Sequence, residues 1–177
     1  MKKYYKIIIA VFILSSLVYF GCEDYSKITA PAFSTGSADF TRFVAVGNSL
    51  TQGEQSSSVF ETGQMYSFPN LIAQQVNTTF AQATISDPGS GGRIEVSDLN
   101  PFTTVENVLT GTPTNLTYPA PYNNLGVKGA FLTDILNTTN ANNCYTSNFG
   151  VPNAMFDLVL RGTGATQMQL ALLQVLG

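Results

Sequence analysis

The clearest pattern along the chain is an apolar run that ends abruptly in a turn. Four apolar residues at 43–46, two of them valine, predict a buried strand. Gly47-Asn48-Ser49 follows at once and predicts a sharp turn. A side chain just past the end of a strand lies at the rim of a sheet, where α/β enzymes place their chemistry. Ser49 is therefore a candidate functional residue.

Three later segments have helical spacing of apolar residues. Residues 67–76 predict a helix with Ser67 as N-cap and Pro69 in the first turn, and its apolar face comprises Phe68, Leu71, Ile72 and Val76. A short helix is predicted over 131–136. Residues 165–176 predict a last amphipathic helix, whose apolar residues are Met168, Leu170, Leu172, Leu173 and Leu176.

Between these helices, residues 86–123 are rich in Gly, Pro, Thr and Asn and contain only short apolar pieces. This composition predicts a long loop without regular elements, which is typical of an insertion or of a loop that covers a site. Regular structure is expected to resume at 124–130. The order of strands and helices predicts an α/β fold around a parallel sheet, incomplete at its C-terminus because the chain supplies few strands.

The first 22 residues have the pattern of an export signal. Lys2, Lys3 and Lys6 precede an apolar run at 7–20, which is shorter than the roughly 20 residues that a membrane-spanning helix needs. The run ends in Gly21-Cys22, which resembles a bacterial lipoprotein signal whose cysteine becomes lipidated. An uncleaved anchor or an ordinary signal is the alternative, and Cys22 would then be merely a small apolar residue.

Three regions are therefore expected: a signal peptide over 1–22, a flexible tether over 23–40 and a folded domain over 41–177. The protein is expected to be exported and lipid-anchored, with the outer membrane favoured over other bacterial membranes. Beyond Cys22 there are five basic residues against all 11 acidic ones, a net charge of −6. Because no basic stripe exists, nucleic acid is excluded as a partner. The oligomeric state stays open.

Few kinds of chemistry fit the remaining residues. Cys144 is the only cysteine besides Cys22, so we expect an incidental thiol and neither a disulfide nor a zinc cluster. No cofactor or metal is implied. The turn after the strand lacks the Lys-Ser/Thr pair of a phosphate-binding loop, and Thr51 departs from the Gly-x-Ser-x-Gly elbow of α/β-hydrolases. The chain also contains no histidine, the usual base for a nucleophilic serine.

Two segments resemble one family of serine hydrolases. Gly-Asn-Ser-Leu-Thr-Gln-Gly at 47–53 resembles the first sequence block of the SGNH (GDSL) hydrolases, with Asn48 where Asp is more common, and Asn-Leu-Gly-Val-Lys-Gly-Ala at 124–130 resembles the second. The resemblance implies a three-layer α/β/α sandwich with a flavodoxin-like parallel sheet. It also implies that Ser49 is the nucleophile of an esterase, and that the N–H groups of Ser49 and Gly129 are two of the three oxyanion donors.

The resemblance covers about residues 41–176 and lacks the rest of the family's machinery. The third block, Gly-x-Asn-Asp, and the fifth block, Asp-x-x-His, do not occur in this sequence. We therefore expect the N-terminal part of a truncated esterase, inactive by itself, whose full form acts on lipid esters or acylated glycans. The missing base, acid and third donor would lie beyond Gly177.

Each of these residues also has a purely structural interpretation. Ser49 could be a turn or cap serine, Gly129 a turn glycine, and Asn48 an Asx side chain that stabilises the turn.

Lys128 could act as the base of a Ser-Lys pair. The acids, among them Asp87 and Asp134, are expected to be solvated loop or helix-cap charges. The alternative function is a surface lipoprotein that binds glycan or lipid through residues 86–123 without turnover.

The lipoprotein interpretation predicts that anchoring depends on Cys22. Several acyl chains on this cysteine would hold the protein firmly on a membrane, whereas a single chain binds only marginally. Cys22→Ala is expected to release the protein or to stall its processing, as measured by membrane fractionation after a carbonate wash. If the variant stays with the washed membranes, residues 7–20 are an uncleaved anchor instead.

Overall fold

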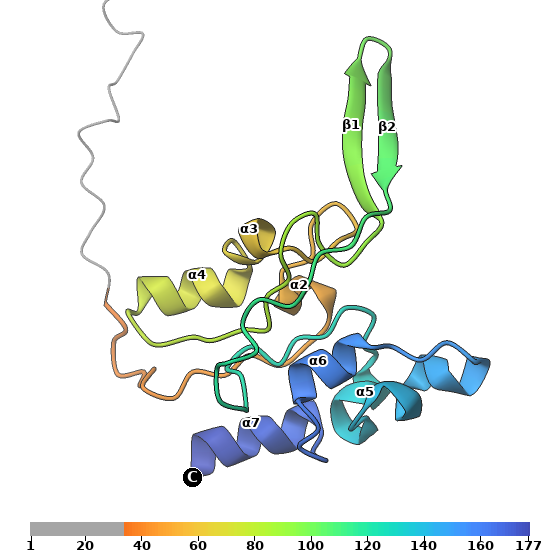
Figure 1. Cartoon of the computed structure of the whole chain (residues 1–177). Helices are drawn as coiled ribbons and strands as arrows, with labels where there is room; N and C mark the ends of the chain where they lie inside the picture. The colour runs from red at the N-terminus through yellow and green to blue at the C-terminus, as the bar shows by residue number, and fades with distance from the viewer. Residues whose placement is uncertain (1–33) are drawn as a thin grey trace, which may run out of the picture. The chain divides into compact units, whose positions relative to one another are not determined.

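The helical spacing in residues 67–76 forms α4, Phe68–Gln75, in the computed structural model, which describes residues 34–177 (Figure 1). The expected face is wrong: Pro69 and Ala73 are buried, whereas Phe68, Leu71 and Ile72 are exposed. The helix packs through its small residues because they allow close approach. Ser67 occupies the N-cap position, but its buried hydroxyl makes no capping bond.

The two later helices are confirmed with slightly shifted bounds, as α5, Leu132–Asn137, and α7, Gln167–Leu176. α7 begins with a capping box: Thr166 accepts a bond from the Gln169 N–H, and the Gln169 side chain accepts one from the Thr166 N–H. Further short helices lie where the pattern predicted none; they are α2, Ser49–Gln52, α3, Glu61–Gln64, α6, Met155–Leu160, and the 3-10 turns η2, Ala141–Asn143, and η3, Tyr145–Phe149.

The strand expected at 43–46 is reduced to one bridging residue. Ala45 forms an isolated parallel bridge to Asn124, and Asn124 forms another to Gln82. Side chains provide further bonds between these segments: the Asn123 amide donates to the Phe43 carbonyl at 3.3 Å and accepts from the Ala81 N–H at 2.9 Å. The three segments therefore lie side by side without forming a regular ladder.

The prediction that residues 86–123 contain no regular elements is also wrong. This segment contains an antiparallel hairpin of β1, Arg93–Leu99, and β2, Phe102–Asn107. β-branched residues are frequent in both strands and favour extended backbone. At its base Arg93 forms ion pairs with Asp87 at 3.0 Å and Glu95 at 2.7 Å. The hydrogen bond to Glu95 raises the pKa of Arg93 above its usual value.

The described residues thus combine helices with a two-stranded antiparallel sheet. Thr35–Gly177 form one compact unit, and the signal, Cys22 and most of the tether lie outside the described residues. The main apolar core of the Thr35–Gly177 unit comprises Ala81, Ala83, Tyr122, Leu125, Val127, Cys144, Phe156, Val159, Leu160 and Leu170. Cys144 is therefore a core residue, and its Sγ lies 3.2 Å from the Ala141 carbonyl oxygen. Within residues 34–177 no helix is long and apolar enough to cross a membrane.

This core predicts that substituting alanine for two leucines changes the free energy of unfolding by very different amounts. Leu125 is fully buried, whereas Leu132 is 74% exposed. Leu125→Ala should lower the free energy of unfolding by about 2–5 kcal/mol, because it removes buried contacts and leaves a cavity. Leu132→Ala is the matched control and should change it by less than about 0.5 kcal/mol. Urea unfolding followed by circular dichroism measures both, and equal effects would contradict this core.

Candidate functional site

Ser49 is the first residue of α2, directly after the Gly47-Asn48 turn. Asn48 caps this short helix, since its side-chain oxygen accepts the Leu50 N–H at 3.2 Å, which confirms the Asx interpretation. Gly53 ends the helix in a left-handed conformation with φ +91°, and its N–H donates to the Ser49 carbonyl at 3.0 Å. The turn therefore holds Ser49 half-buried at the end of the 43–47 segment.

Gly47 is required by close packing. A Cβ atom at this position would lie 2.1 Å from Oγ1 of the buried Thr51, so any larger residue would displace α2. The Gly47 N–H donates to Oε1 of Gln167, at the start of α7, at 3.3 Å. Gln167 is fully buried, and its Nε2 has no hydrogen-bond partner among the described residues. The N-terminus of α7 thus holds the backbone two residues before Ser49.

The second motif lies directly against the first. The Leu125 N–H donates to the Ala45 carbonyl at 2.8 Å, and the Val127 N–H donates to the Gly47 carbonyl at 3.1 Å. A Cβ atom on Gly126 would lie 2.6 Å from the Gln52 nitrogen, so the two backbones touch there. The fold therefore brings together the segments at 47–53 and 124–130 that the sequence singled out.

Two buried amide side chains, which sequence reasoning missed, join these segments. Oε1 of Gln52 accepts the Lys128 N–H at 2.6 Å, and Nδ2 of Asn124 donates to the Thr51 carbonyl at 2.8 Å. Both side chains are about 2% exposed. Their only signal in the sequence is their position inside the two motifs. Gln52 fixes the residue that precedes Gly129 relative to the helix that begins at Ser49.

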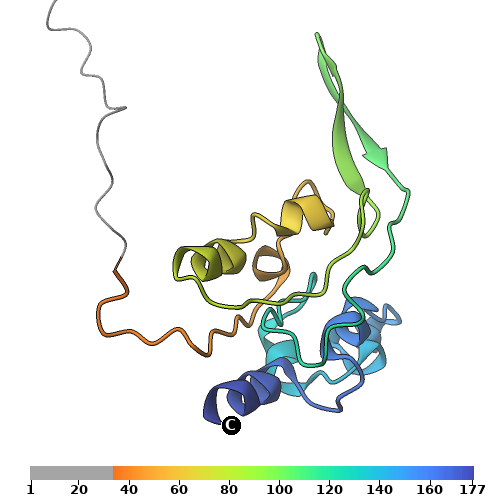
Figure 2. The same cartoon turned by 60° about the vertical axis from the view of Figure 1, so that its left-hand side comes forward.

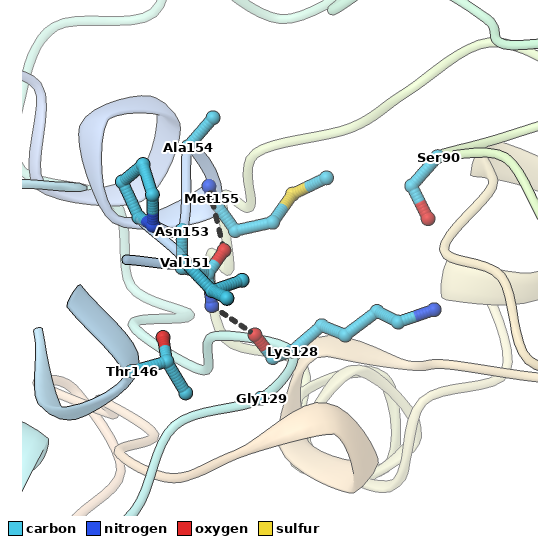
Figure 3. Close-up of a pocket in the computed structure, with 9 residues that line it drawn as sticks. Ser90, Lys128, Gly129, Thr146, Val151, Asn153, Ala154 and Met155 are labelled. Atoms are coloured by element: carbon cyan, nitrogen blue, oxygen red, sulfur yellow. Dashed lines mark hydrogen bonds between the residues drawn. The ribbon is translucent and has the colours of Figure 1, made fainter. Parts of the chain in front are cut away.

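Gly129 is exposed, with φ +80°, and lines a cavity of about 370 Å³ whose other lining residues are Ser90, Lys128, Thr146, Val151, Pro152, Asn153, Ala154 and Met155 (Figure 3). Ser49 is not among the lining residues. Asn153, also missed from sequence, donates to the Lys128 carbonyl at 2.7 Å. Within residues 34–177, neither the Ser49 N–H nor the Gly129 N–H donates a hydrogen bond.

No base among the described residues forms a hydrogen bond with the Ser49 hydroxyl, which makes no hydrogen bond of any kind within residues 34–177. Nζ of Lys128 pairs with Glu54 at 3.1 Å and donates to the Ser57 carbonyl. The lysine therefore holds the 54–57 loop, and its contacts give no support to a Ser-Lys pair.

The two singled-out acids differ in their surroundings. Asp87 is about half exposed and pairs with Arg93, as a surface charge would. Asp134 is 1% exposed, so it is not a solvated charge, but it lies at N3 of α5 and confirms the alternative expectation of a helix-cap charge. Its carboxylate accepts the Phe131 N–H, the Tyr145 N–H and the Thr138 hydroxyl, which stabilise the start of α5 and the following turn. No metal-binding group of three or more His, Cys, Asp or Glu residues occurs in the part of the chain that the structure describes.

The Gln52 bridge predicts a specific loss of stability. Gln52→Leu leaves the part-buried Lys128 N–H without its acceptor, which should lower the free energy of unfolding by about 1–3 kcal/mol. Gln75→Leu is the control, because Gln75 is exposed on α4, and it should stay within about 0.5 kcal/mol of the parent chain. Urea unfolding measures both. A Gln52→Leu chain as stable as the control would show that the bridge is dispensable.

Comparison with protein families, with curated proteins and with solved structures finds no match to this chain.

Proposed function

We propose that residues 41–177 carry the nucleophile and two oxyanion donors of an exported, lipid-anchored SGNH-type serine esterase. The observation that carries the proposal is the contact between the 47–53 turn and the 124–130 segment, each of which contributes an N–H without a hydrogen bond, at Ser49 and Gly129. The three-layer sandwich with a parallel sheet is part of this proposal. The isolated parallel bridges at Asn124 are compatible with it.

In the proposed reaction, Oγ of Ser49 attacks the carbonyl carbon of an ester, and the carbonyl oxygen becomes an oxyanion. The N–H groups of Ser49 and Gly129 stabilise this oxyanion, each by about 3–4 kcal/mol when preorganised. Collapse of the intermediate expels the alcohol and leaves an acyl-serine, which water then hydrolyses. The proton of Ser49 needs a base that the 177 residues do not supply, since they include no histidine. We propose that this base, its acid and the third donor lie beyond Gly177.

The proposed substrates are carboxylic esters on lipids or on acylated glycans, which an anchored enzyme outside the cell would meet. The alternative is a lipoprotein that binds glycan or lipid through residues 86–123 without turnover. The exposed apolar side chains of the β1–β2 hairpin, which lies in that segment, favour this alternative. The two functions differ in whether Ser49 becomes covalently labelled.

A fluorophosphonate probe tests the proposal on a chain extended to include the histidine base. Only an activated hydroxyl reacts with such probes, so Ser49 should be the single labelled serine in a peptide map. Ser49→Ala should abolish labelling and reduce ester turnover, on the order of a millionfold for comparable knockouts of a serine nucleophile. The melting temperature should stay within a few degrees of the parent.

The 177-residue chain is the matched control for that experiment. It should hydrolyse p-nitrophenyl acetate no faster than its own Ser49→Ala variant, because no base is present. Labelling that persists in the extended Ser49→Ala chain would assign the nucleophile elsewhere. Ser49-dependent turnover by the 177-residue chain would contradict the absence of a base and would favour Lys128 as the base of a Ser-Lys pair.

A further inference from the structure

The β1–β2 hairpin has one apolar face, which its register defines. Ile94 lies opposite Glu106, Val96 opposite Thr104, and Leu99 opposite Phe102. Directly opposite side chains of an antiparallel pair lie on the same face. Because a bulge interrupts the alternation between Val96 and Asp98, Leu99 falls on the same face as Val96. The apolar ribbon face therefore comprises Ile94, Val96, Leu99 and Phe102.

The opposite face of the hairpin is mainly polar, and its apolar residue is Val105, opposite Glu95. The hydroxyls of Ser97 and Thr103 lie 2.8 Å apart there. Nearer the base, Glu95 accepts bonds from Arg93 at 2.7 Å and from Asn107 at 3.1 Å. Two hydrogen bonds lower the pKa of Glu95: the one from Asn107 has the larger effect and the one from Arg93 the smaller. Its carboxylate therefore stays ionised at neutral pH. Thus the hairpin is amphipathic across its two faces.

The apolar ribbon face is open to solvent over its whole length. Its residues are 46%, 57%, 80% and 68% exposed, in chain order, and exposure is greatest at the tip. Figures 1 and 2 show the hairpin pointing away from the helices of the same unit. Together these side chains expose roughly 500 Å² of apolar surface, comparable to the largest apolar patch of a typical monomer, which is often functional.

We propose that the apolar ribbon face enters the surface of a lipid bilayer and gives the domain a second membrane contact besides its anchor. This inference rests on the anchoring part of the proposed function. The proposed anchor at Cys22 is separated from the expected folded domain by the 18 residues at 23–40, and a flexible chain of that length would have an end-to-end distance of roughly 20–25 Å. Lipid is therefore the apolar phase that the hairpin meets at the highest effective concentration.

The charge distribution along the hairpin favours lipid as the occupant. On the apolar ribbon face the only charged residue is Glu106, which lies opposite Ile94 near the base. No charged side chain shares that face with Leu99 and Phe102 at the tip. Asp98, the acid nearest the tip, belongs to the other face, because it lies opposite Thr103. On the apolar ribbon face, charge is thus confined to the base, away from the end that would enter first.

The backbone of the hairpin suits the bilayer surface and not its hydrocarbon core. Ser97 has no partner in the register because of the bulge, and each strand of this two-stranded sheet has an open outer edge. Such edges do not occur in hydrocarbon, whereas water and lipid headgroups at the surface can bond to them. A second copy is the weaker choice, since two such faces would bury roughly 1,000 Å² in total, the lower limit for a specific interface.

Tryptophan fluorescence tests the insertion, because the chain contains no tryptophan and one substitution gives a unique reporter. Phe102→Trp reports on the apolar ribbon face, Leu99→Trp repeats the test from the other strand, and Thr103→Trp is the control on the polar face. Each full chain is reconstituted into phosphatidylcholine vesicles that contain a spin-labelled quencher lipid. Circular dichroism checks that the variants keep the parent spectrum.

The reporters at 99 and 102 should be quenched at least about threefold more than the one at 103, with emission shifted to shorter wavelength, as for side chains buried at a membrane interface. Equally weak quenching at all three positions, as for tryptophan side chains that stay in water, would overturn the insertion. A shift to shorter wavelength that needs no vesicles and grows with protein concentration would also overturn it, in favour of a second copy. Mass spectrometry of Cys22 tests the anchor separately: a chain without lipid on Cys22 but with selective quenching refutes the anchor and supports the insertion.

Discussion

The need to satisfy buried backbone groups without regular strands shapes the centre of this unit. The segments around Ala45, Gln82 and Asn124 lie side by side but share only isolated bridges, so a continuous ladder does not pair their N–H and C=O groups. Buried amide side chains take over this role. Gln64 donates to the Ala83 carbonyl at 2.7 Å and accepts the Ile85 N–H at 3.2 Å. An unpaired buried polar group would cost about 1–3 kcal/mol, so each amide matters.

The same amides fix the candidate site. Asn124 reaches both the Thr51 carbonyl and the side chain of Gln82, and Gln52 reaches the backbone next to Gly129. As a result, the turn that presents Ser49 is bonded to the segment that presents Gly129 by side chains as well as by main chain. A site built for oxyanion stabilisation requires this kind of rigid support, because donors that move at the moment of reaction contribute less.

Apolar surface is distributed differently from what amphipathic spacing suggests. α4 buries Pro69 and Ala73 and exposes its large apolar residues, and α7 buries Leu170 while Leu173 is 66% exposed. Small residues let a helix approach the loops beneath it closely, whereas large ones would hold it away. The hairpin adds a third exposed apolar surface, distinct from the helices because it is amphipathic across a ribbon and points away from them (Figure 2).

Local signals determined what the sequence alone could predict: the helices expected at 67–76, 131–136 and 165–176, which form with slightly shifted bounds, and the turn that carries Ser49. Helical spacing, N-cap residues and glycines act over a few positions, so they can be recognised in the sequence. The tertiary structure decided the rest. Whether residues 43–46 become a strand depends on partners some 80 residues away, and the burial of Gln52 and Asp134 depends on which segments pack over them. The hairpin was hidden because its pattern is visible only once a bulge places Leu99 beside Val96. Long-range contacts, which leave no periodicity in the chain, set these features.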